Sequence, residues 1–222
     1  RRTSLFVSES EATMKIVVFG ASGGTGVEIV RQALDAGHEV TAFVRNPAKL
    51  DIRHANLVIV QGDVTDAVAV EKAVAGKDAV ISALGPTRPP VPGMMETAAR
   101  NIVAAMKQAG IHRLVSTTGA GVRDEQDQPK LVDHLLKGLL TLLAGEVLKD
   151  SAANVAVIRA SNVDWTIVRY PRLIDGPLRG NYRVGYVGRD SGTQLSRADG
   201  AHFVLKELTG GKHIHQMPVV SY

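Results

Sequence analysis

The chain contains no cysteine, and phenylalanine, tryptophan and tyrosine together make up only 4% of its 222 residues. Without cysteine it cannot form disulfide bonds, zinc–thiolate sites or thiol nucleophiles, and we expect no metal site. No apolar run approaches the ~18 residues that a membrane-spanning helix requires, so we expect no membrane partner. The net charge is +4, but Lys and Arg form no block, which favours an anionic small molecule over nucleic acid.

Length and composition indicate one folded domain. A chain of 222 residues with 45% hydrophobic residues can bury a good core. Residues 1–13 precede Met14, which resembles a natural start, so we interpret them as an extension that is non-native or disordered. The domain is then residues 14–222. Nothing points to secretion, and we expect a cytoplasmic protein that is a monomer or a small homo-oligomer.

A glycine cluster near the N-terminus is the strongest motif. Residues 15–19 favour a strand, residues 20–26 are glycine-rich, and residues 27–34 have helical spacing. This strand–turn–helix context predicts a dinucleotide site, and it disfavours the alternative of a glycine turn without a ligand. The residues expected at the phosphates are Gly20, Ser22, Gly23, Gly24, Thr25 and Gly26.

Each glycine of the spacing G-x-x-G-x-x-G has a distinct expected role. Gly20 permits the tight turn, Gly23 lets the backbone approach the pyrophosphate, and Gly26 lets the helix pack against the strand. The free N–H groups at the start of the helix would then face the phosphates.

Strands and helices alternate along the rest of the chain. Strands are expected over residues 39–44, 57–60, 79–84, 113–118, 165–169 and 217–220. Helices are expected over residues 67–75, 94–109, 131–148, 151–161 and 198–208, and residues 171–195 form a Gly-, Pro- and Arg-rich stretch. This order predicts an α/β fold with a doubly wound parallel sheet, a Rossmann fold, as a single domain with a small C-terminal elaboration on the substrate side. Ligands bind beyond the carboxyl ends of such strands.

The residues after the second strand indicate which cofactor is bound. An acidic residue there would bind the ribose hydroxyl of NAD, whereas an arginine suits the additional phosphate of NADP. Arg45 stands at this position and Lys49 provides a second charge, so we predict NADP (as NADPH). The alternative is a solvated basic edge.

Two further strand ends are expected along the cofactor. Asp63 could accept a hydrogen bond from the adenine amino group while Val64 packs on the ring. Asp63 could equally cap the following helix, as could Thr65 or Asp66. Leu84 and Gly85 end the fourth strand, where small residues would let the sugar and phosphates pass.

Several stretches of the chain resemble one family. They are residues 20–26, 44–45, 62–64, 74–81, 99–107 and 176–182. Together they resemble the atypical, NAD(P)-binding branch of the short-chain dehydrogenase/reductase superfamily, and within it the biliverdin-IXβ and flavin reductase group with its NmrA-like relatives. The resemblance implies an NADPH-dependent reductase with an open cleft above the fourth to sixth strands, acting on a flavin, tetrapyrrole or quinone-like acceptor.

The catalytic Ser, Tyr and Lys that are usual in the superfamily are absent. No tyrosine lies between the fifth and sixth strands, and Gly119 stands where the serine is expected. Thr118 is the nearest hydroxyl and could bond the substrate or the nicotinamide amide, and His134 could donate a proton. The alternative is that Thr118 has only a structural role and that His134 lies on the helix surface. A flavin-like acceptor could take a hydride while water supplies the proton.

Basic residues on the predicted cleft loops favour an anionic acceptor. Arg88 and Arg172 are the candidate substrate ligands, and the backbone at Pro171 is expected to contact the nicotinamide amide. A charged rim without specificity is the alternative. Near the C-terminus, Ser196 and Asp199 have capping-box spacing and are assigned to structure.

A second class of function remains open from the sequence. Relatives of this branch include redox-sensing regulatory proteins that bind NADP without turnover, and the missing Tyr and Lys are compatible with that role too.

Overall fold

The computed structural model describes residues 12–87, 89–128 and 131–222, and the side chains of residues 131–144 lie outside this description. The strands are β1 (Lys15–Phe19), β2 (Glu39–Val44), β3 (Leu57–Gln61), β4 (Ala79–Ser82), β5 (Arg113–Gly119), β6 (Asp164–Tyr170), β7 (Arg172–Ile174), β8 (Arg183–Gly185), β9 (Gln194–Ser196) and β10 (Val219–Ser221). The helices are α1 (Gly24–Asp35), α2 (Ala67–Val74), α3 (Met94–Ala109), α4 (Leu131–Arg159) and α5 (Arg197–Gly210), with a short 3-10 helix η1 (Pro47–Lys49).

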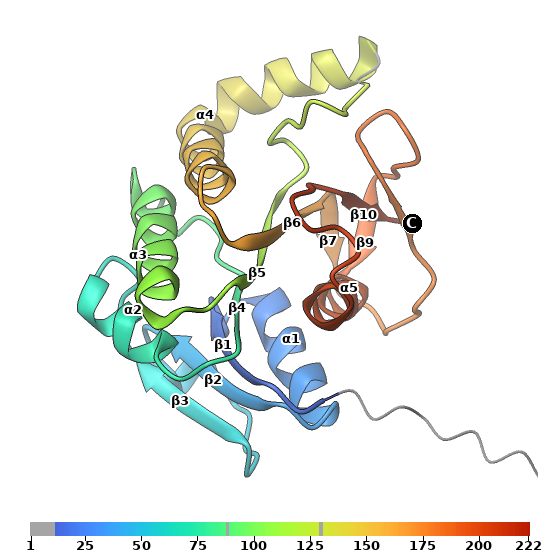
Figure 1. Cartoon of the computed structure of the whole chain (residues 1–222). Coiled ribbons are helices and arrows are strands. Elements are labelled where there is room, and N and C mark those ends of the chain that lie inside the picture. The colour runs from blue at the N-terminus through green and yellow to red at the C-terminus, as the bar shows by residue number, and fades with distance from the viewer. Residues whose placement is uncertain (1–11, 88, 129–130) are drawn as a thin grey trace, which may run out of the picture.

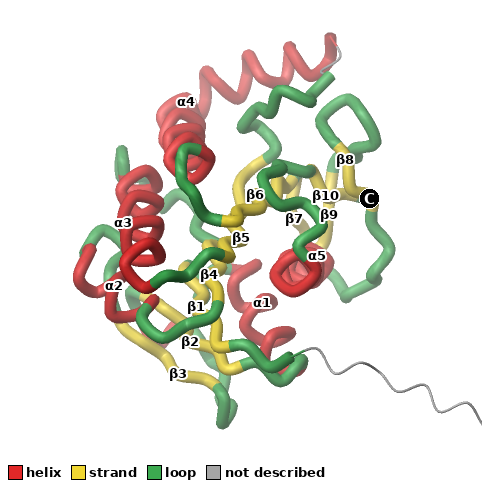
Figure 2. Tube along the Cα trace, viewed as in Figure 1, coloured by secondary structure: helices red, strands yellow, loops and turns green. Residues whose placement is uncertain are grey.

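An eight-stranded sheet forms the centre of the molecule. Its order is β3-β2-β1-β4-β5-β6-β10-β8, and only the β10–β8 pair is antiparallel. Helices α1 and α5 cover one face and α2, α3 and α4 cover the other (Figures 1 and 2). The predicted doubly wound, single-domain α/β fold is therefore confirmed.

The central strand β1 is apolar on both sides because helices cover both faces of the sheet there. Val17 and Phe19 pack into the core beneath α2 and α3, whereas Ile16 and Val18 pack beneath α1 and α5. A parallel strand that is covered on both faces reads as a continuous apolar run rather than an alternating one.

The structure corrects or decides three details of the sequence-based expectations. The two helical stretches around residues 131–161 form the single helix α4, which changes direction along its length (Figure 1). The stretch 171–195 contains three short strands, and β7 and β9 pair in a separate small sheet. Asp66 rather than Asp63 caps α2, because Asp66 Oδ1 accepts from Val68 N–H and Ala69 N–H.

Helix α3 is capped by a side chain from another helix. Its own N-cap, Gly93, offers no side chain. Asp150 of α4 replaces it, because its two carboxylate oxygens accept from Met95 N–H at 3.0 Å and Glu96 N–H at 3.1 Å. Asn154, one turn further on, donates to Met95 O at 2.8 Å. These bonds fix this part of α4 against the start of α3.

Asp199 holds the C-terminal elaboration together. Its Oδ1 accepts from Arg179 N–H and Gly180 N–H, and its Oδ2 accepts from the hydroxyls of Tyr222 and Ser196. Ser196 caps α5 as predicted, by accepting from Asp199 N–H at 3.0 Å. The carboxylate of Asp199 is fully buried, and its hydrogen-bond donors outweigh burial, so its pKa lies below the usual value.

A buried ion pair ties the strand β6 to the segment after β5. Arg169 is completely buried and donates to both carboxylate oxygens of Asp127 at 2.7 Å, and also to Val122 O and Met217 O. Asp127 in turn accepts from Val187 N–H at 3.0 Å. The ion pair thus joins four segments that are distant in sequence: β6, residues 122–127, Val187 and Met217.

We expect Arg169→Met to lower the free energy of unfolding by about 3–5 kcal/mol, because it leaves the carboxylate of Asp127 buried without its cation. Urea unfolding followed by circular dichroism measures this. Arg100→Met is the control, since the exposed Arg100–Glu96 pair on α3 is worth at most about 1 kcal/mol. An equal loss in both variants would contradict the role assigned to the buried pair.

The same pair should make stability sensitive to acid. Burial acts to raise the pKa of Asp127, but its hydrogen bonds with Arg169 and the backbone and the charge of Arg169 outweigh burial and lower that pKa. The stabilisation is therefore complete above the pKa of the unfolded carboxyl, about 3.9, and is lost as the pH falls through the lower pKa of the folded protein. Asp127→Asn should make the free energy of unfolding depend less on pH in this acid range, as measured by urea unfolding at a series of pH values.

Candidate functional site

The glycine turn between β1 and α1 is packed too tightly for side chains at two positions. Gly20 has a φ of +77°, and a Cβ there would lie 2.5 Å from Ala83 O. A Cβ on Gly26 would lie 2.1 Å from Gly20 O, because the first turn of α1 rests directly on the turn. These two glycines are required by the fold itself.

Gly23 and Gly24 are not required in this way. Gly23 has an ordinary φ of −76°, and its nearest obstacle, Gly20 O, is 3.3 Å away. A Cβ on Gly24 would meet only the side chain of Arg197. Helix α1 has no side-chain cap and no acidic residue in its first turn, so its N-terminal N–H groups and dipole are left for an anion. The turn fits the diphosphate of a dinucleotide.

A cleft of about 340 Å³ opens beside this turn, at the carboxyl ends of β1, β4, β5 and β6. It is lined by Gly23, Gly24, Thr25, Ala83, Leu84, Gly85, Pro86, Met95, Thr117, Thr118, Gly119, Ser151, Tyr170, Pro171, Leu173 and Arg197. Three of the predicted turn residues, Gly23, Gly24 and Thr25, thus line one cleft together with Leu84, Gly85, Thr118 and Pro171. The location is the edge at which open α/β sheets bind ligands.

The other predicted cofactor residues do not line the cleft. Some belong to the glycine turn, and the others follow the ends of β2 and β3. Arg45 is exposed directly after β2, and Lys49 is exposed in η1, whose N-cap is Asn46. Asp63 accepts from Thr65 N–H and Thr65 Oγ1–H, and these bonds, opposed by burial and helped by the charge of Arg45, lower its pKa. Arg45 and Asp63 are therefore neighbours at the ends of adjacent strands.

Val64 and Ser22 are placed less favourably for direct contact. Val64 is only 7% exposed and packs into the core, so little of its side chain remains for an adenine ring. Ser22 is part of the turn but does not line the cleft.

The described lining of the cleft offers hydroxyls rather than acids. Thr117 and Thr118 from β5 and Ser151 from α4 all line it, and Arg197 is the only charged residue in the described lining. Tyr170 also lines the cleft, but its hydroxyl donates to Gly200 O at 2.9 Å and burial raises its pKa strongly. Tyr170 is thus unsuited to donate a proton in the cleft.

Sequence reasoning missed Ser151, Met95 and Arg197. Ser151 and Met95 reach the cleft because Asp150 ties α4 to the start of α3, a contact over 55 residues that no local pattern reveals. Arg197 follows the capping residue Ser196, and its position could have been noticed from the arginine directly after a predicted N-cap.

The predicted substrate residue Arg172 does not line the cleft, and two further predicted residues have side chains outside the described part of the chain. On β7 the chain alternates, so Pro171 and Leu173 line the cleft and Arg172 between them does not. Arg88 and the side chain of His134 lie outside the described residues.

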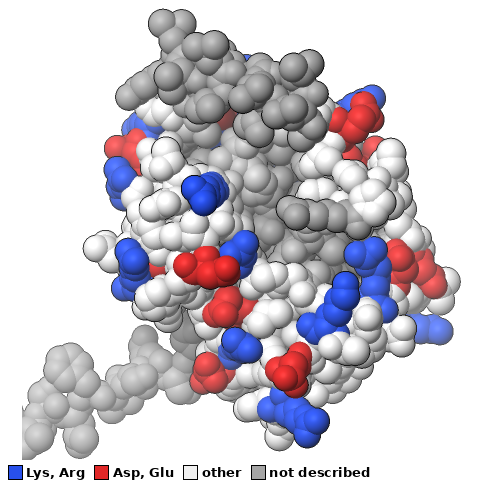
Figure 3. Space-filling view, turned by 180° about the vertical axis from the view of Figure 1, so that it is seen from behind, with Lys and Arg blue, Asp and Glu red and all other residues white. Residues whose placement is uncertain are grey.

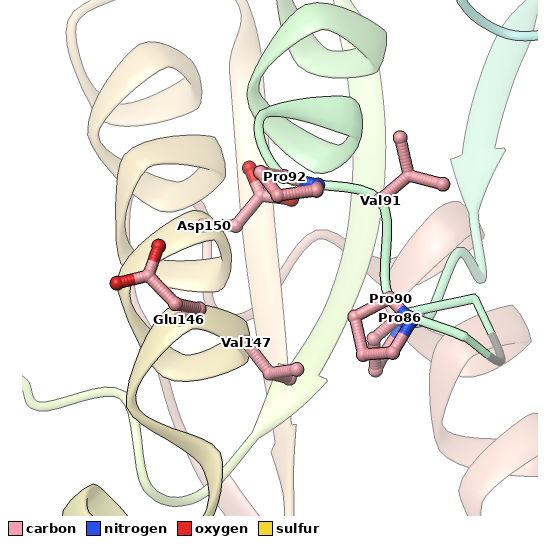
Figure 4. Close-up of a pocket in the computed structure, with 7 residues that line it drawn as sticks. All are labelled: Pro86, Pro90, Val91, Pro92, Glu146, Val147 and Asp150. Atoms are coloured by element: carbon pink, nitrogen blue, oxygen red, sulfur yellow. The ribbon is translucent and has the colours of Figure 1, made fainter.

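A second, much smaller hollow adjoins the cleft (Figure 4). It measures about 20 Å³, room for roughly one water molecule. Pro86, Pro90, Val91 and Pro92 form one side and α4 the other, with Val147 between them (Figure 4). Pro86 lines both spaces, so this proline-rich loop closes the cleft toward α4.

On one face of the molecule the charges are mixed in sign. On the face shown in Figure 3, Lys and Arg alternate with Asp and Glu. No helix in the described part of the chain is both long enough and apolar enough to span a bilayer.

Comparisons with known proteins agree with this site. Residues 20–210 match the model of a family described as NAD(P)H-binding. The uncharacterized protein YwnB of Bacillus subtilis is 32% identical over 212 residues, which cover 90% of this chain and 94% of YwnB. The (4-alkanoyl-5-oxo-2,5-dihydrofuran-3-yl)methyl phosphate reductase of Streptomyces griseus is 29% identical over 155 residues, 69% of this chain but only 46% of that protein.

Solved structures share the fold over nearly the whole chain. A short-chain dehydrogenase/reductase of Veillonella parvula in complex with NADP superposes with a TM-score of 0.75 and covers 95% of each chain, at 19% identity. The predicted NAD(P)-binding family is confirmed, and at 19% identity the likeness to the short-chain dehydrogenase/reductase structure shows a shared fold. The chain belongs to the NAD(P)H-binding family, and with its short-chain dehydrogenase/reductase-like fold and its reductase relatives it is an oxidoreductase.

Proposed function

We propose that this oxidoreductase uses NADPH to reduce a conjugated small-molecule acceptor, such as a flavin, a tetrapyrrole or a quinone-like compound, without a proton donor from the protein. The observation that carries the proposal is the described lining of the cleft, which offers the hydroxyls of Thr117, Thr118 and Ser151 and no carboxyl, histidine or free tyrosine. An isolated ketone needs a positioned acid, whereas a conjugated acceptor spreads the negative charge that it gains.

The cofactor, when bound, supplies a hydride. The residues of this chain then bind and orient the cofactor and the acceptor. The glycine turn and the N-terminus of α1 hold the phosphates, Thr118 offers a hydrogen bond to the nicotinamide amide or to the acceptor, and the side-chain-free Gly119 leaves room beside it. Leu84, Met95 and Leu173 provide apolar walls on which a planar acceptor can rest.

The Streptomyces griseus relative supports a conjugated acceptor. Its name describes a reductase for a phosphorylated unsaturated lactone, a substrate whose ring double bond is conjugated with a carbonyl group. That likeness covers less than half of the relative, so the particular acceptor of this chain is left to experiment.

We expect the protein to consume NADPH steadily with FMN or a quinone, and not with simple ketones, when the loss of nicotinamide absorbance is followed. Thr118→Val, Tyr170→Phe and His134→Ala should each keep the kcat for FMN within about tenfold, because a positioned general acid is worth about 100-fold or more. Cofactor affinity is measured separately in each variant.

A thousandfold lower kcat in the His134 or Thr118 variant would mean that the side chain takes part in the transition state, against the proposal. Tight NADPH binding with no turnover on any acceptor would favour a redox-sensing regulatory protein instead.

We expect Gly23→Val to abolish NADPH binding while the fold is kept. The side chain would occupy the place of the diphosphate, whereas the backbone conformation of Gly23 suits valine and the cost at a helix N-cap is about 1 kcal/mol. Calorimetry measures the binding. Gly26→Val is the contrasting variant and should unfold the protein, since its side chain overlaps Gly20 O. Unchanged affinity in folded Gly23→Val would contradict the proposed site.

We expect Arg45→Ala to weaken NADPH binding about thirtyfold, or ~2 kcal/mol, and to leave NADH binding nearly unchanged, because a hydrogen bond to a charged group is worth about that much. Arg53→Ala, which removes another exposed arginine between β2 and β3, is the control. Equal losses for both cofactors would show that Arg45 does not bind the 2′-phosphate.

A further inference from the structure

Arg197 lies directly over the start of α1. It is the first residue of α5, and a Cβ placed on Gly24 would be 2.7 Å from Arg197 Nε and 2.8 Å from its Cδ, with no other described group outside the turn as near. Helices α1 and α5 pack side by side, and Gln32 of α1 donates to Ala198 O at 2.9 Å. The guanidinium and the N-terminus of α1 therefore place two positive features at one point of the cleft.

One carboxylate occupies Arg197 in the structure. Arg197 Nη1 lies 2.6 Å from Asp175 Oδ1. The side chain of Arg197 is 31% exposed, whereas that of Asp175 is 97% exposed. An ion pair with one partner almost wholly in water is weak, so Asp175 can be exchanged at little cost.

The loop that carries Asp175 does not depend on this pair. Further along the same loop, Arg179 N–H and Gly180 N–H donate to the buried carboxylate of Asp199, on the same turn of α5 as Arg197. Breaking the exposed contact therefore leaves the buried one in place. The loop can stay where it is while Arg197 changes its partner.

We propose that Asp175 is an internal competitor for the cofactor, and that Arg197 passes from its carboxylate to the diphosphate when the dinucleotide enters. The inference deepens the proposed function and rests on a dinucleotide at the glycine turn. A diphosphate suits the guanidinium better than Asp175 does, because it carries two charges and meets the planar donors of arginine beside a helix N-terminus. The exposed pair keeps the arginine positioned beside the turn before the cofactor arrives.

The test is a double-mutant cycle on binding, with no turnover involved. The dissociation constants of NADPH and of ADP-ribose, which has the diphosphate but no nicotinamide, are measured by calorimetry for wild type, Arg197→Met, Asp175→Asn and the double variant. Arg197→Met should weaken both ligands by about 10- to 100-fold. Asp175→Asn should tighten both by about two- to fivefold, and this gain should vanish when Arg197 is absent.

The exposed pair Arg189–Asp190 supplies matched controls, because it has the same charges outside the cleft lining. Arg189→Met and Asp190→Asn should leave both dissociation constants within about twofold. If Arg197→Met folds poorly by its thermal midpoint, Arg197→Gln keeps a polar side chain of similar length and replaces it.

Three results would overturn the inference. Unchanged or weaker binding in Asp175→Asn would remove the competitor role. Unchanged dissociation constants for both ligands in Arg197→Met would show that the arginine does not bind the diphosphate. A wild type that binds neither NADPH nor ADP-ribose would overturn the proposed function as well, and only that result does so.

Discussion

The close contact between Gly26 and Gly20 O is the constraint on which the site depends. It seats the first turn of α1 directly on the turn after β1, so the helix points its bare N-terminus across the carboxyl edge of the sheet. Helix α5 packs along α1 and begins beside it, which carries Arg197 over Gly24. The phosphate end of the cleft thus follows from one backbone contact that tolerates no side chain.

The opposite end of the cleft depends on polar contacts between distant segments. Asp150 caps α3 from α4 and so holds the next residue, Ser151, at the cleft, and Arg169 binds Asp127 and so fixes the segment that follows β5. Buried charges of this kind cost desolvation, which their hydrogen bonds offset only when all partners are in place. A cleft built in this way keeps its shape without a large apolar core of its own.

Sequence reasoning succeeded where the signal is local. The glycine turn, the strand ends at Leu84 and Thr118, and the N-cap at Ser196 all follow from neighbouring residues. It missed Ser151 and Arg197, because their places depend on contacts across 55 residues and on the packing of α5 against α1. Arg172 shows the same limit, since the strand β7 that turns it from the cleft lies in a stretch too rich in Gly and Pro to predict as strand.

The chemistry of the cleft bears on selectivity as well as on rate. An enzyme with a fixed acid selects the substrate whose oxygen meets that acid, whereas hydroxyls such as those of Thr118 and Ser151 accept or donate as the ligand requires. Discrimination among acceptors must then come from shape and charge, which here means the walls formed by Met95 and Leu173 and the charge of Arg197. Arg197 lies beside Gly24 at the phosphate end, so if it exchanges Asp175 for the diphosphate as proposed, the bound cofactor neutralises its charge and the apolar walls carry more of the discrimination.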